Sequence, residues 1–395
     1  KQLKERFYFF FNEFISLGLT GKRIAIIGKN SFEWVLSYLC AATVGIAVPL
    51  DKEIHPDDAK AFIDFAECEA ICYGTTYSQN IDLIVPESTK HISFSDIMNI
   101  SQPRNTIDCI AVDSIKILKD EMRILIFTSG TTGSAKGVCL SQYNICFNIH
   151  STVSVVRIRQ NDTTLSILPL HHTYECTLDC LLILSRGAMI TYCDGVAEIA
   201  RNFLEYSPSI LVVVPAILKM LNKRITKSIV KACPKKYKSY YETESLASAL
   251  RKTPYIIRKL ICKKVSKSLG GRIRLFIVGA AELDTSLVDD FAELGIRTLQ
   301  GYGLTECSPL LAGNTDFYLN AASTGIAIPG VTLKIDNPNE AGVGEIIAKG
   351  DNIMLGYYKD QQATDRVLRD GWFHTGDLGC MDPDGALYIK GRIKN

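Results

Sequence analysis

The chain has 395 residues, with 47% hydrophobic, 22% charged and 9% aromatic side chains and a formal net charge of +2. This composition excludes a largely disordered chain, a collagen-like fibre and a coiled coil. A single hydrophobic core stops growing near ~250–300 residues, so we expect two or three packed subdomains. No apolar run reaches the roughly 18 residues of a membrane span, and charged residues interrupt segment 1–19, so we expect neither a membrane span nor a signal peptide in this sequence.

Thirteen cysteines are scattered along the chain without a repeating spacing. This pattern is typical of reduced thiols packed in a core and not of the disulfide framework of a small secreted domain. We therefore expect a cytoplasmic protein. The chain starts at Lys1 and ends at Asn395, soon after Gly391 and Arg392, and we interpret it as an excised part of a longer protein.

Positive charge is concentrated in segment 219–274, which holds 17 lysines and arginines against two acids, a local charge of +15. A block this basic attracts polyanions, and the candidates are an anionic membrane surface, which would make the protein peripheral at the membrane, or a phosphorylated cofactor. We expect no nucleic acid partner, because no zinc finger, basic zipper or RNA-binding aromatic signature accompanies the charge. For any single lysine, a solvated helical face is the alternative interpretation.

Through most of the chain, short β-branched runs alternate with amphipathic stretches. The predicted pairs of strand and helix are 23–27 with 31–44, 123–127 with 141–156, and 211–214 with 215–225. Such alternation predicts βα units in largely parallel, doubly wound sheets. Ser141 is placed to cap the second helix, and Pro215 suits a first helical turn. The phenylalanines before residue 15 predict an amphipathic helix packed on the first sheet, with lipid contact as the alternative.

From about Asp316 onward, short extended runs stand between turn signals such as Asn337-Pro338-Asn339. The runs are 332–336, 344–348 and 386–389. We expect antiparallel β structure in this part of the chain.

A predicted strand at 124–127 leads into segment 128–137, which is rich in hydroxyl side chains and glycines and contains one lysine, Lys136. Glycines let backbone N–H groups converge on an anion, the hydroxyls add donors, and the lysine adds positive charge. The segment therefore suits a polyphosphate, with a flexible surface loop as the alternative. It is not a Walker loop, because Lys136 follows Ala135 and precedes Gly137.

Two further predicted strands end in loops suited to a nucleotide. Segment 279–282 offers small residues against which a flat ring can lie. In the next loop, Tyr302 can stack on a base, Thr305 can donate to a phosphate, and Glu306 can hold a divalent cation. Ligands of doubly wound sheets bind beyond the carboxyl ends of the strands, where these loops fall. A single nucleotide site is the economical interpretation.

Near the C-terminus, a tight turn bounded by glycines contains Asp377, and Arg392 follows soon afterwards. An acid beside a nucleotide commonly takes the ribose hydroxyls. We therefore expect Asp377 to contribute to the same site.

Taken together, these motifs resemble those of the adenylate-forming superfamily of acyl-CoA synthetases, aryl-CoA ligases, luciferases and peptide-synthetase adenylation domains. The motifs are 128–138, 301–306, 371–377 and Gly391-Arg392, in this order and at these separations. The similarity covers nearly the whole chain. Segment 168–175 and the basic insert before residue 270 most resemble the long-chain fatty-acyl branch.

The resemblance implies an α/β fold of two doubly wound sheets with flanking helices, layered as αβαβα, and a small distorted antiparallel β-barrel. It places two packed α/β subdomains with the ATP and acyl sites in residues 1–312 and a β-rich subdomain in residues 313–392. Residues 393–395 would begin the hinge to a C-terminal lid.

It also implies roles for individual residues. The residues that would hold the β- and γ-phosphates of ATP are Thr128, Ser129, Gly130, Thr131, Thr132, Gly133 and Lys136. The other implied nucleotide-binding residues are Gly279, Ala280, Ala281, Gln300, Gly301, Tyr302, Gly303, Thr305, Asp377 and Arg392, of which Tyr302 would pack on adenine, Thr305 would contact the α-phosphate, and Asp377 and Arg392 would hold the ribose. Glu306 would bind Mg²⁺, and His172 would border the acyl carboxylate. Residues 213–215 with Gly301 would help form an acyl tunnel. The implied catalytic residues are Thr305, Glu306, His172 and Lys136.

The implied activity is the ATP-dependent conversion of a carboxylic acid, a medium- or long-chain fatty acid, to acyl-AMP with release of pyrophosphate. In the full-length protein, the acyl group would pass to coenzyme A. Ala135 stands where most members have proline, which affects the rigidity of the phosphate loop but not its charge. The family's adenylation lysine lies beyond Arg392, so we expect the present chain to bind ATP and acid but to be nearly inactive alone.

Alternatives remain open. The chain could be an amino-acid or aryl-acid adenylation domain that loads a carrier protein, or a catalytically inactive nucleotide-binding homologue. A metal cluster is the alternative interpretation of His171, His172, Glu175, Cys176 and Cys180. Segment 228–231 matches the Ser-x-x-Lys motif of penicillin-recognising hydrolases, but it lacks their accompanying motifs.

Overall fold

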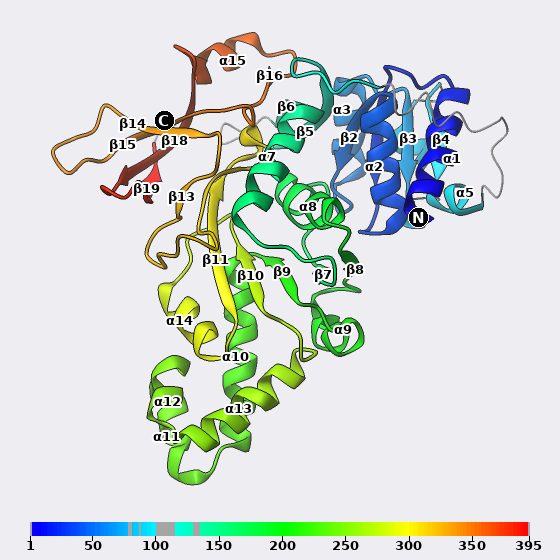
Figure 1. Ribbon diagram of the computed structural model, residues 1–395. Coiled ribbons are helices and arrows are strands. Elements are labelled where there is room, and N and C mark those ends of the chain that lie inside the picture. The colour runs from blue at the N-terminus through cyan, green and yellow to red at the C-terminus, as the bar shows by residue number, and fades with distance from the viewer. Residues whose placement is uncertain (1, 78–80, 87, 100–114, 129–134, 394–395) are drawn as a thin grey trace.

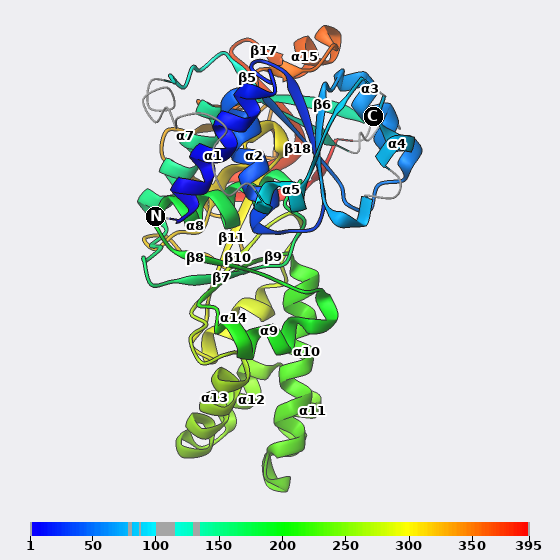
Figure 2. The same cartoon turned by 90° about the vertical axis from the view of Figure 1, so that its right-hand side faces the viewer.

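The structure is a computed structural model that describes residues 2–77, 81–86, 88–99, 115–128 and 135–393 (Figure 1). Two large, mainly parallel sheets and a smaller antiparallel sheet organise it. Helices cover and separate the two large sheets, and a group of helices projects away from the second sheet (Figures 1 and 2). None of the helices in the described ranges combines the length and the apolarity that crossing a bilayer requires.

The first sheet is built mostly from buried β-branched runs. In spatial order, its strands are β16 (Gly356–Tyr357), β6 (Lys136–Ser141), β5 (Met122–Thr128), β2 (Ile46–Leu50), β1 (Arg23–Ile27), β3 (Ala70–Tyr73) and β4 (Lys90–Ser93). Strands β1 to β5 run parallel, whereas β6 and β16 run antiparallel to their neighbours. The parallel strands are apolar on both faces because helices cover both faces.

The helices of the first half divide between those two faces. One face packs on α1 (Gln2–Ser16), α2 (Phe32–Val44) and α5 (Phe94–Asn99), and the other packs on α3 (Pro56–Ala66) and α4 (Ile81–Ile84). Ser31 caps α2, since its hydroxyl accepts a hydrogen bond from the backbone N–H of Trp34. In α1, Phe10 and Phe14 are buried in the core, as predicted for an amphipathic helix.

A layer of helices separates the second large sheet from the first. In spatial order, its strands are β13 (Ile326–Ala327), β12 (Leu310–Gly313), β11 (Arg297–Gly303), β10 (Leu275–Val278), β9 (Ile210–Val213), β7 (Thr163–Ser166) and β8 (Met189–Tyr192). Packed between the two large sheets are α7 (Gln142–Val155), a π-helix (Tyr174–Leu181) and α8 (Leu182–Ser185), together with α2. The outer face packs on α9 (Ile199–Tyr206), α10 (Pro215–Ala232) and α14 (Thr285–Glu293).

The remaining elements form two appendages. The third sheet contains β14 (Thr332–Asp336), β15 (Gly344–Lys349), β18 (Trp372–Met381), β17 (Leu368–Arg369) and β19 (Leu387–Arg392), all antiparallel, and α15 (Gln361–Val367) lies beside it. The helical lobe, residues 215–268, contains α10, α11 (Lys235–Thr243), α12 (Leu246–Lys252) and α13 (Tyr255–Ser268).

The predicted fold class, a layered αβαβα core with a small antiparallel β unit, is confirmed. Ser141 caps α7 in a reciprocal capping box with Asn144, and Pro215 lies in the first turn of α10, both as predicted. The division at residue 312 stays a prediction, and β13 and β16, which follow that residue, complete the two large sheets.

Three local predictions were wrong. The segment between 127 and 141 is not only a loop, because β6 pairs antiparallel with β5 before α7 begins. Residues 300–303 continue strand β11. Asp377 lies inside the long strand β18, opposite Arg392, and not in a tight turn.

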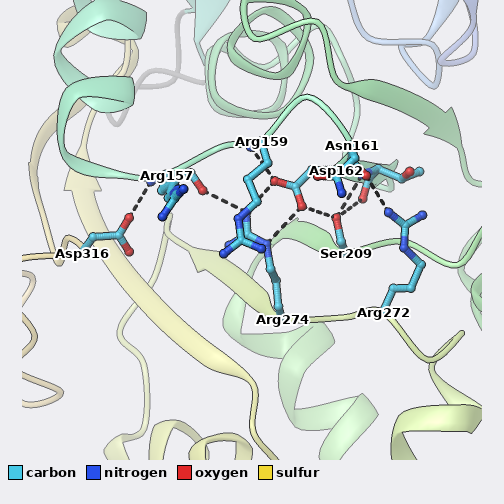
Figure 3. Close-up of polar contacts among 9 residues, drawn as sticks. Arg157, Arg159, Asn161, Asp162, Ser209, Arg272, Arg274 and Asp316 are labelled. Atoms are coloured by element: carbon cyan, nitrogen blue, oxygen red, sulfur yellow. Dashed lines mark hydrogen bonds and ion pairs between the residues drawn. The ribbon is translucent and has the colours of Figure 1, made fainter.

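A buried ion pair joins the amino ends of the second sheet's parallel strands (Figure 3). Asp162, just before β7, is only 4% exposed. Its carboxylate accepts hydrogen bonds from Ser209 Oγ at 2.7 Å, from Arg274 Nε at 3.1 Å and from Arg274 Nη2 at 2.5 Å. Ser209 precedes β9 and Arg274 precedes β10, so this carboxylate ties three adjacent strands together at one end of the sheet.

Candidate active site

One large cavity, of about 1990 Å³, opens beyond the carboxyl ends of strands β9, β10 and β11. Its walls come from all three sheets. The described residues that the sequence predicts for the site all line it: Thr128, Lys136, His172, Gly279, Ala280, Ala281, Gln300, Gly301, Tyr302, Gly303, Thr305, Glu306, Asp377 and Arg392. The predicted phosphate-loop residues that lie outside the described residues are Ser129, Gly130, Thr131, Thr132 and Gly133.

The two ends of the predicted phosphate loop are brought together by the hairpin of β5 and β6. Thr128 lies opposite Lys136 in the register of this hairpin. The Lys136 Nζ then lies 4.7 Å from the centre of the Tyr357 ring, an attractive contact between a cation and an aromatic face. Lys136 therefore places its positive charge at the cavity wall, as a phosphate-binding lysine requires.

Tyr357 also contacts the other predicted charged group. Its hydroxyl donates a hydrogen bond to Glu306 Oε1 at 2.8 Å, and burial, assisted by the Glu306 charge, raises the pKa of Tyr357. Tyr357 thus lies between Lys136 and Glu306. The sequence gives no local signal for this role, because β16 reaches the site only by pairing with β6.

The turn that carries Thr305 and Glu306 is held by two buried amides that the sequence analysis missed. Asn148 of α7 donates to the carbonyl oxygens of Cys307 and Leu310 at 3.2 and 2.9 Å, and Asn352 donates to the same two oxygens at 3.1 and 2.9 Å. Each carbonyl oxygen can accept twice, so both amides are accommodated. This bracing fixes the short 3₁₀ turn Thr305–Cys307 against the core.

At the predicted nucleoside end, Tyr302 and Asp377 contact each other. The Tyr302 hydroxyl donates to Asp377 Oδ2 at 2.8 Å, and Arg392 Nε lies 3.1 Å from Asp377 Oδ1. Burial, followed by the charge of Asp377, raises the pKa of Tyr302, so the phenol stays protonated. Gly303 must lack a side chain, because a Cβ there would lie 1.8 Å from the carbonyl oxygen of Pro309.

His172 lines the cavity just before the π-helix, and the ring centre of the adjacent His171 lies 4.0 Å from that of His172. Burial, and then the neighbouring imidazole, lowers the pKa of His171 to about 4, and burial also lowers the pKa of His172. Both rings are therefore neutral near pH 7, so His172 can offer a hydrogen bond to a carboxylate without a full charge.

Two carboxyl groups are buried behind His172. Glu175 accepts from Ser166 Oγ at 2.7 Å, and Asp179 accepts from Thr164 Oγ1 at 2.5 Å. Glu175 Oε2 and Asp179 Oδ2 have no donor among the described groups. Burial raises the pKa of both acids, that of Asp179 to about 7, and a proton on the pair satisfies the remaining oxygens.

The structure does not bring His171, His172, Glu175, Cys176 and Cys180 together as the metal cluster that was considered from the sequence. Within the described ranges, one group of three His, Cys, Asp or Glu ligand atoms lies close enough together for an ion, and it contains Asp336, Glu345 and His374. The guanidinium of Arg369 lies 3.1 Å from His374 Nδ1 and 3.9 Å from Glu345, and a cation in that position disfavours a metal ion.

Comparison with known proteins agrees with the motifs. Residues 1–358 match the family model described as AMP-binding enzyme. Human long-chain-fatty-acid–CoA ligase 1 is 32% identical over 94% of this chain and 59% of its own length. Long chain acyl-CoA synthetase 3 of Arabidopsis thaliana is 26% identical over 95% of this chain and 63% of its own length. The chain thus spans about three fifths of these relatives.

Solved structures share the fold. The inhibitor-bound N-terminal domain of FACL13 from Mycobacterium tuberculosis has a TM-score of 0.77 at 22% identity, covering 99% of this chain and 92% of that chain. ATP-bound MatB from Rhodopseudomonas palustris also has a TM-score of 0.77, at 24% identity, and covers 99% of this chain and 72% of that chain. Because the family model matches more than half of its residues, the chain belongs to the AMP-binding enzyme family.

Proposed function

We propose that the chain forms the nucleotide- and acid-binding part of an AMP-forming acyl-CoA synthetase. The complete protein activates a medium- or long-chain fatty acid with ATP and transfers the acyl group to coenzyme A. The observation that carries the proposal is the convergence of Lys136, Tyr302, Glu306 and Asp377 on one cavity. The similarity to proteins named as long-chain fatty-acid ligases supports a fatty acid as the substrate.

In this reaction, a carboxylate oxygen of the fatty acid attacks the α-phosphorus of ATP. The bond from that phosphorus to the bridging oxygen breaks, and pyrophosphate leaves with the electron pair. No side chain forms a covalent bond, so positioning and charge stabilisation provide the rate. Tyr302 packs on adenine, Asp377 with Arg392 holds the ribose, Thr305 donates to the α-phosphate, and Lys136 stabilises the negative charge of the leaving group.

The residues present fit a magnesium ion. Glu306 offers a carboxylate and Thr305 a hydroxyl on one turn that two asparagines hold in place, and Mg²⁺ prefers oxygen donors. When bound, the ion neutralises phosphate charge.

The surroundings of His172 favour a fatty acid over an amino acid. An amino-acid substrate needs a negative charge to receive its ammonium group. Glu175 lines the cavity, but it is fully buried, and burial raises the pKa of its carboxyl group, which favours the uncharged form. The adjacent imidazoles are neutral as well. An acyl carboxylate can accept a hydrogen bond here, whereas an ammonium group finds no counter-charge among these three residues.

Exchange of radiolabelled pyrophosphate into ATP tests the proposal on the complete protein. We expect exchange with fatty acids and not with amino acids or aryl acids, and Lys136→Ala should lower it strongly while Lys349→Ala, an exposed lysine on β15, leaves it unchanged. Exchange with amino acids alone would mean a domain that loads a carrier protein. Tight ATP binding without exchange for any acid would mean an inactive nucleotide-binding homologue.

The proposal also includes the thiol that accepts the acyl group and a contact with a membrane surface. Coenzyme A is the proposed acceptor thiol, and acyl-CoA formation from a preformed adenylate tests it against a carrier protein. The basic segment 219–274 supports peripheral contact with an anionic membrane, since its charge is +15.

A further inference from the structure

The helical lobe projects away from the sheets (Figures 1 and 2). It contains most of the basic segment 219–274, whose charge is +15. Its acids are few: Lys252 pairs with Glu244 at 2.7 Å, while Arg251 of α12 and Arg258, near the start of α13, pair with Glu293 of the neighbouring α14. By contrast, no carboxylate among the described residues pairs with the exposed lysines of α13, which are Lys259, Lys263, Lys264 and Lys267. The exposed face of α13 therefore presents uncompensated charge.

Large apolar side chains stand on the same helix as these lysines. Tyr255 is 66% exposed, Ile256 is 73% exposed and Leu260 is 62% exposed. Ile256 and Leu260 are four residues apart and therefore share one face of α13. Lys263 and Lys267 continue this face toward the C-terminal end of the helix, whereas Val265 points inward and is buried.

Lysines together with exposed apolar side chains on one helix face indicate the kind of partner more specifically than positive charge alone does. Single exposed apolar residues such as Leu204 on α9, which is also 62% exposed, are normal on protein surfaces. A phosphate backbone would pair with the lysines but would leave Ile256 and Leu260 in water. A helix with apolar and lysine side chains on one exposed face matches the headgroup boundary of an anionic bilayer, which solvates both kinds of group.

We infer that the exposed face of α13 docks on an anionic lipid bilayer, with Ile256 and Leu260 entering the headgroup boundary and Lys259, Lys263 and Lys267 contacting lipid phosphates or carboxylates. This specifies the membrane contact that the proposed function includes. Binding to lipid requires neither ATP nor acid, so its failure is distinguishable from a failure of the adenylation chemistry.

Co-sedimentation of the full chain with vesicles tests the inference. We expect binding to phosphatidylcholine vesicles that contain phosphatidylserine, little binding to phosphatidylcholine alone, and weaker binding as salt rises. Each lysine near an anionic surface contributes about fivefold, so Lys263→Glu with Lys267→Glu should reduce binding at least tenfold. Ile256→Ser with Leu260→Ser should reduce it about tenfold.

Leu204→Ser is the matched control, because it removes an equally exposed leucine from another helix, and it should leave lipid binding unchanged. Circular dichroism and urea midpoints establish that each variant is folded, which is expected because the changed residues are exposed. The inference is overturned if the unmodified chain ignores anionic vesicles, if both double variants bind them like the unmodified chain, or if the basic face retains double-stranded RNA in preference to lipid.

Discussion

Tyr357 connects two residues of opposite charge that are far apart in the sequence. It places its ring against Lys136 and its hydroxyl against Glu306, and it lies on a strand of only two residues. A carboxylate that accepts such a hydrogen bond is oriented before any ligand arrives. Tyr357 is therefore a positioning residue for the proposed magnesium and phosphate contacts.

Changing Tyr357→Phe tests this role. Loss of a hydrogen bond to a charged group costs about 1.5–3 kcal/mol, so we expect pyrophosphate exchange in the complete protein to fall by about tenfold or more at a fixed MgATP concentration. The loss should appear mainly in the KM for MgATP and in its magnesium dependence, which a purely structural role would not change.

Tyr358→Phe is the matched control for this change. The Tyr358 ring packs edge-on against Phe65, and its hydroxyl lies 3.5 Å from Glu67, away from the cavity. We expect near-normal exchange from this variant. Equal losses in the two variants would contradict the positioning role of Tyr357.

The buried pair of Glu175 and Asp179 gives the protein a pH-dependent stability. Burial raises the pKa of Asp179 from an ordinary value near ~4 to about 7, so in this interval the native state keeps a proton that the unfolded chain has lost. The free energy of unfolding therefore falls as pH rises from about 4 to about 7 and then levels off with respect to Asp179.

We expect Asp179→Asn to reduce this dependence, because the amide cannot titrate and can donate to Glu175. Urea unfolding at several pH values between about 4 and about 7 measures it. Asp384→Asn, which changes an exposed acid, should keep the slope of the unmodified chain. An unchanged slope in Asp179→Asn would rule out a raised pKa of Asp179 as the source of this pH dependence.

Much of the candidate site was predictable at the scale of single residues, because the types of these residues are suited to binding a ligand. Tyr302, Glu306 and Asp377 are polar or aromatic residues among glycines beside predicted strands, so their kind and position already indicate a ligand. Asn148 and Asn352 could not be found in this way. One lies inside a helix and the other in a loop, and only the tertiary fold brings both amides to the same carbonyl oxygens.

At the scale of elements, strands were predicted where short β-branched runs are bounded by turn residues. β1 and β14 have the bounds that the sequence predicts. β6 was missed because Lys136 and Gly137 belong to a polar loop by composition, whereas pairing with β5 draws them into the sheet. The order of strands was not predictable, because it depends on contacts between distant segments.

The hydrogen bonds of Asp162, which join three strands, lead to a prediction at the scale of elements. Asp162 is buried and accepts two hydrogen bonds from Arg274, so Asp162→Ala would leave the guanidinium without its partner. We expect the free energy of unfolding to fall by about 3 kcal/mol, as for other broken buried pairs. Chemical denaturation measures this change.

Asp194→Ala provides the comparison for this network. Asp194 pairs with Arg201 at 2.6 Å, but both side chains are about half exposed. We expect a change below ~1 kcal/mol. Similar losses for the two variants would show that the strand ends do not depend on the buried pair.

At the scale of the whole molecule, the C-terminal part is interleaved with the rest. β13 extends the second sheet and β16 extends the first, although both follow residue 312 in the chain. The cavity likewise takes walls from all three sheets. Such interleaving predicts that the described units unfold together.

The two tryptophans of the chain can test this cooperativity. Trp34 lies in α2 against the first sheet, and Trp372 begins β18 of the third. In Trp34→Phe the fluorescence reports the β-rich part, and in Trp372→Phe it reports the first sheet. Within each variant, we expect the fluorescence transition in urea to coincide with that of circular dichroism. An earlier fluorescence transition in Trp34→Phe would mean that residues 313–392 unfold independently.

The hydrogen bond and the ion pair that Asp377 already makes have a consequence for sugar selectivity at the proposed nucleotide site. Tyr302 and Arg392 already satisfy this carboxylate, so a nucleotide that lacks a ribose hydroxyl leaves no buried acceptor unpaired. Strong rejection of such an analogue requires an orphaned polar group, and none is created here. Deoxyadenosine triphosphate should therefore compete with ATP within about tenfold, and the proposed nucleotide site should discriminate by base and phosphate more than by sugar.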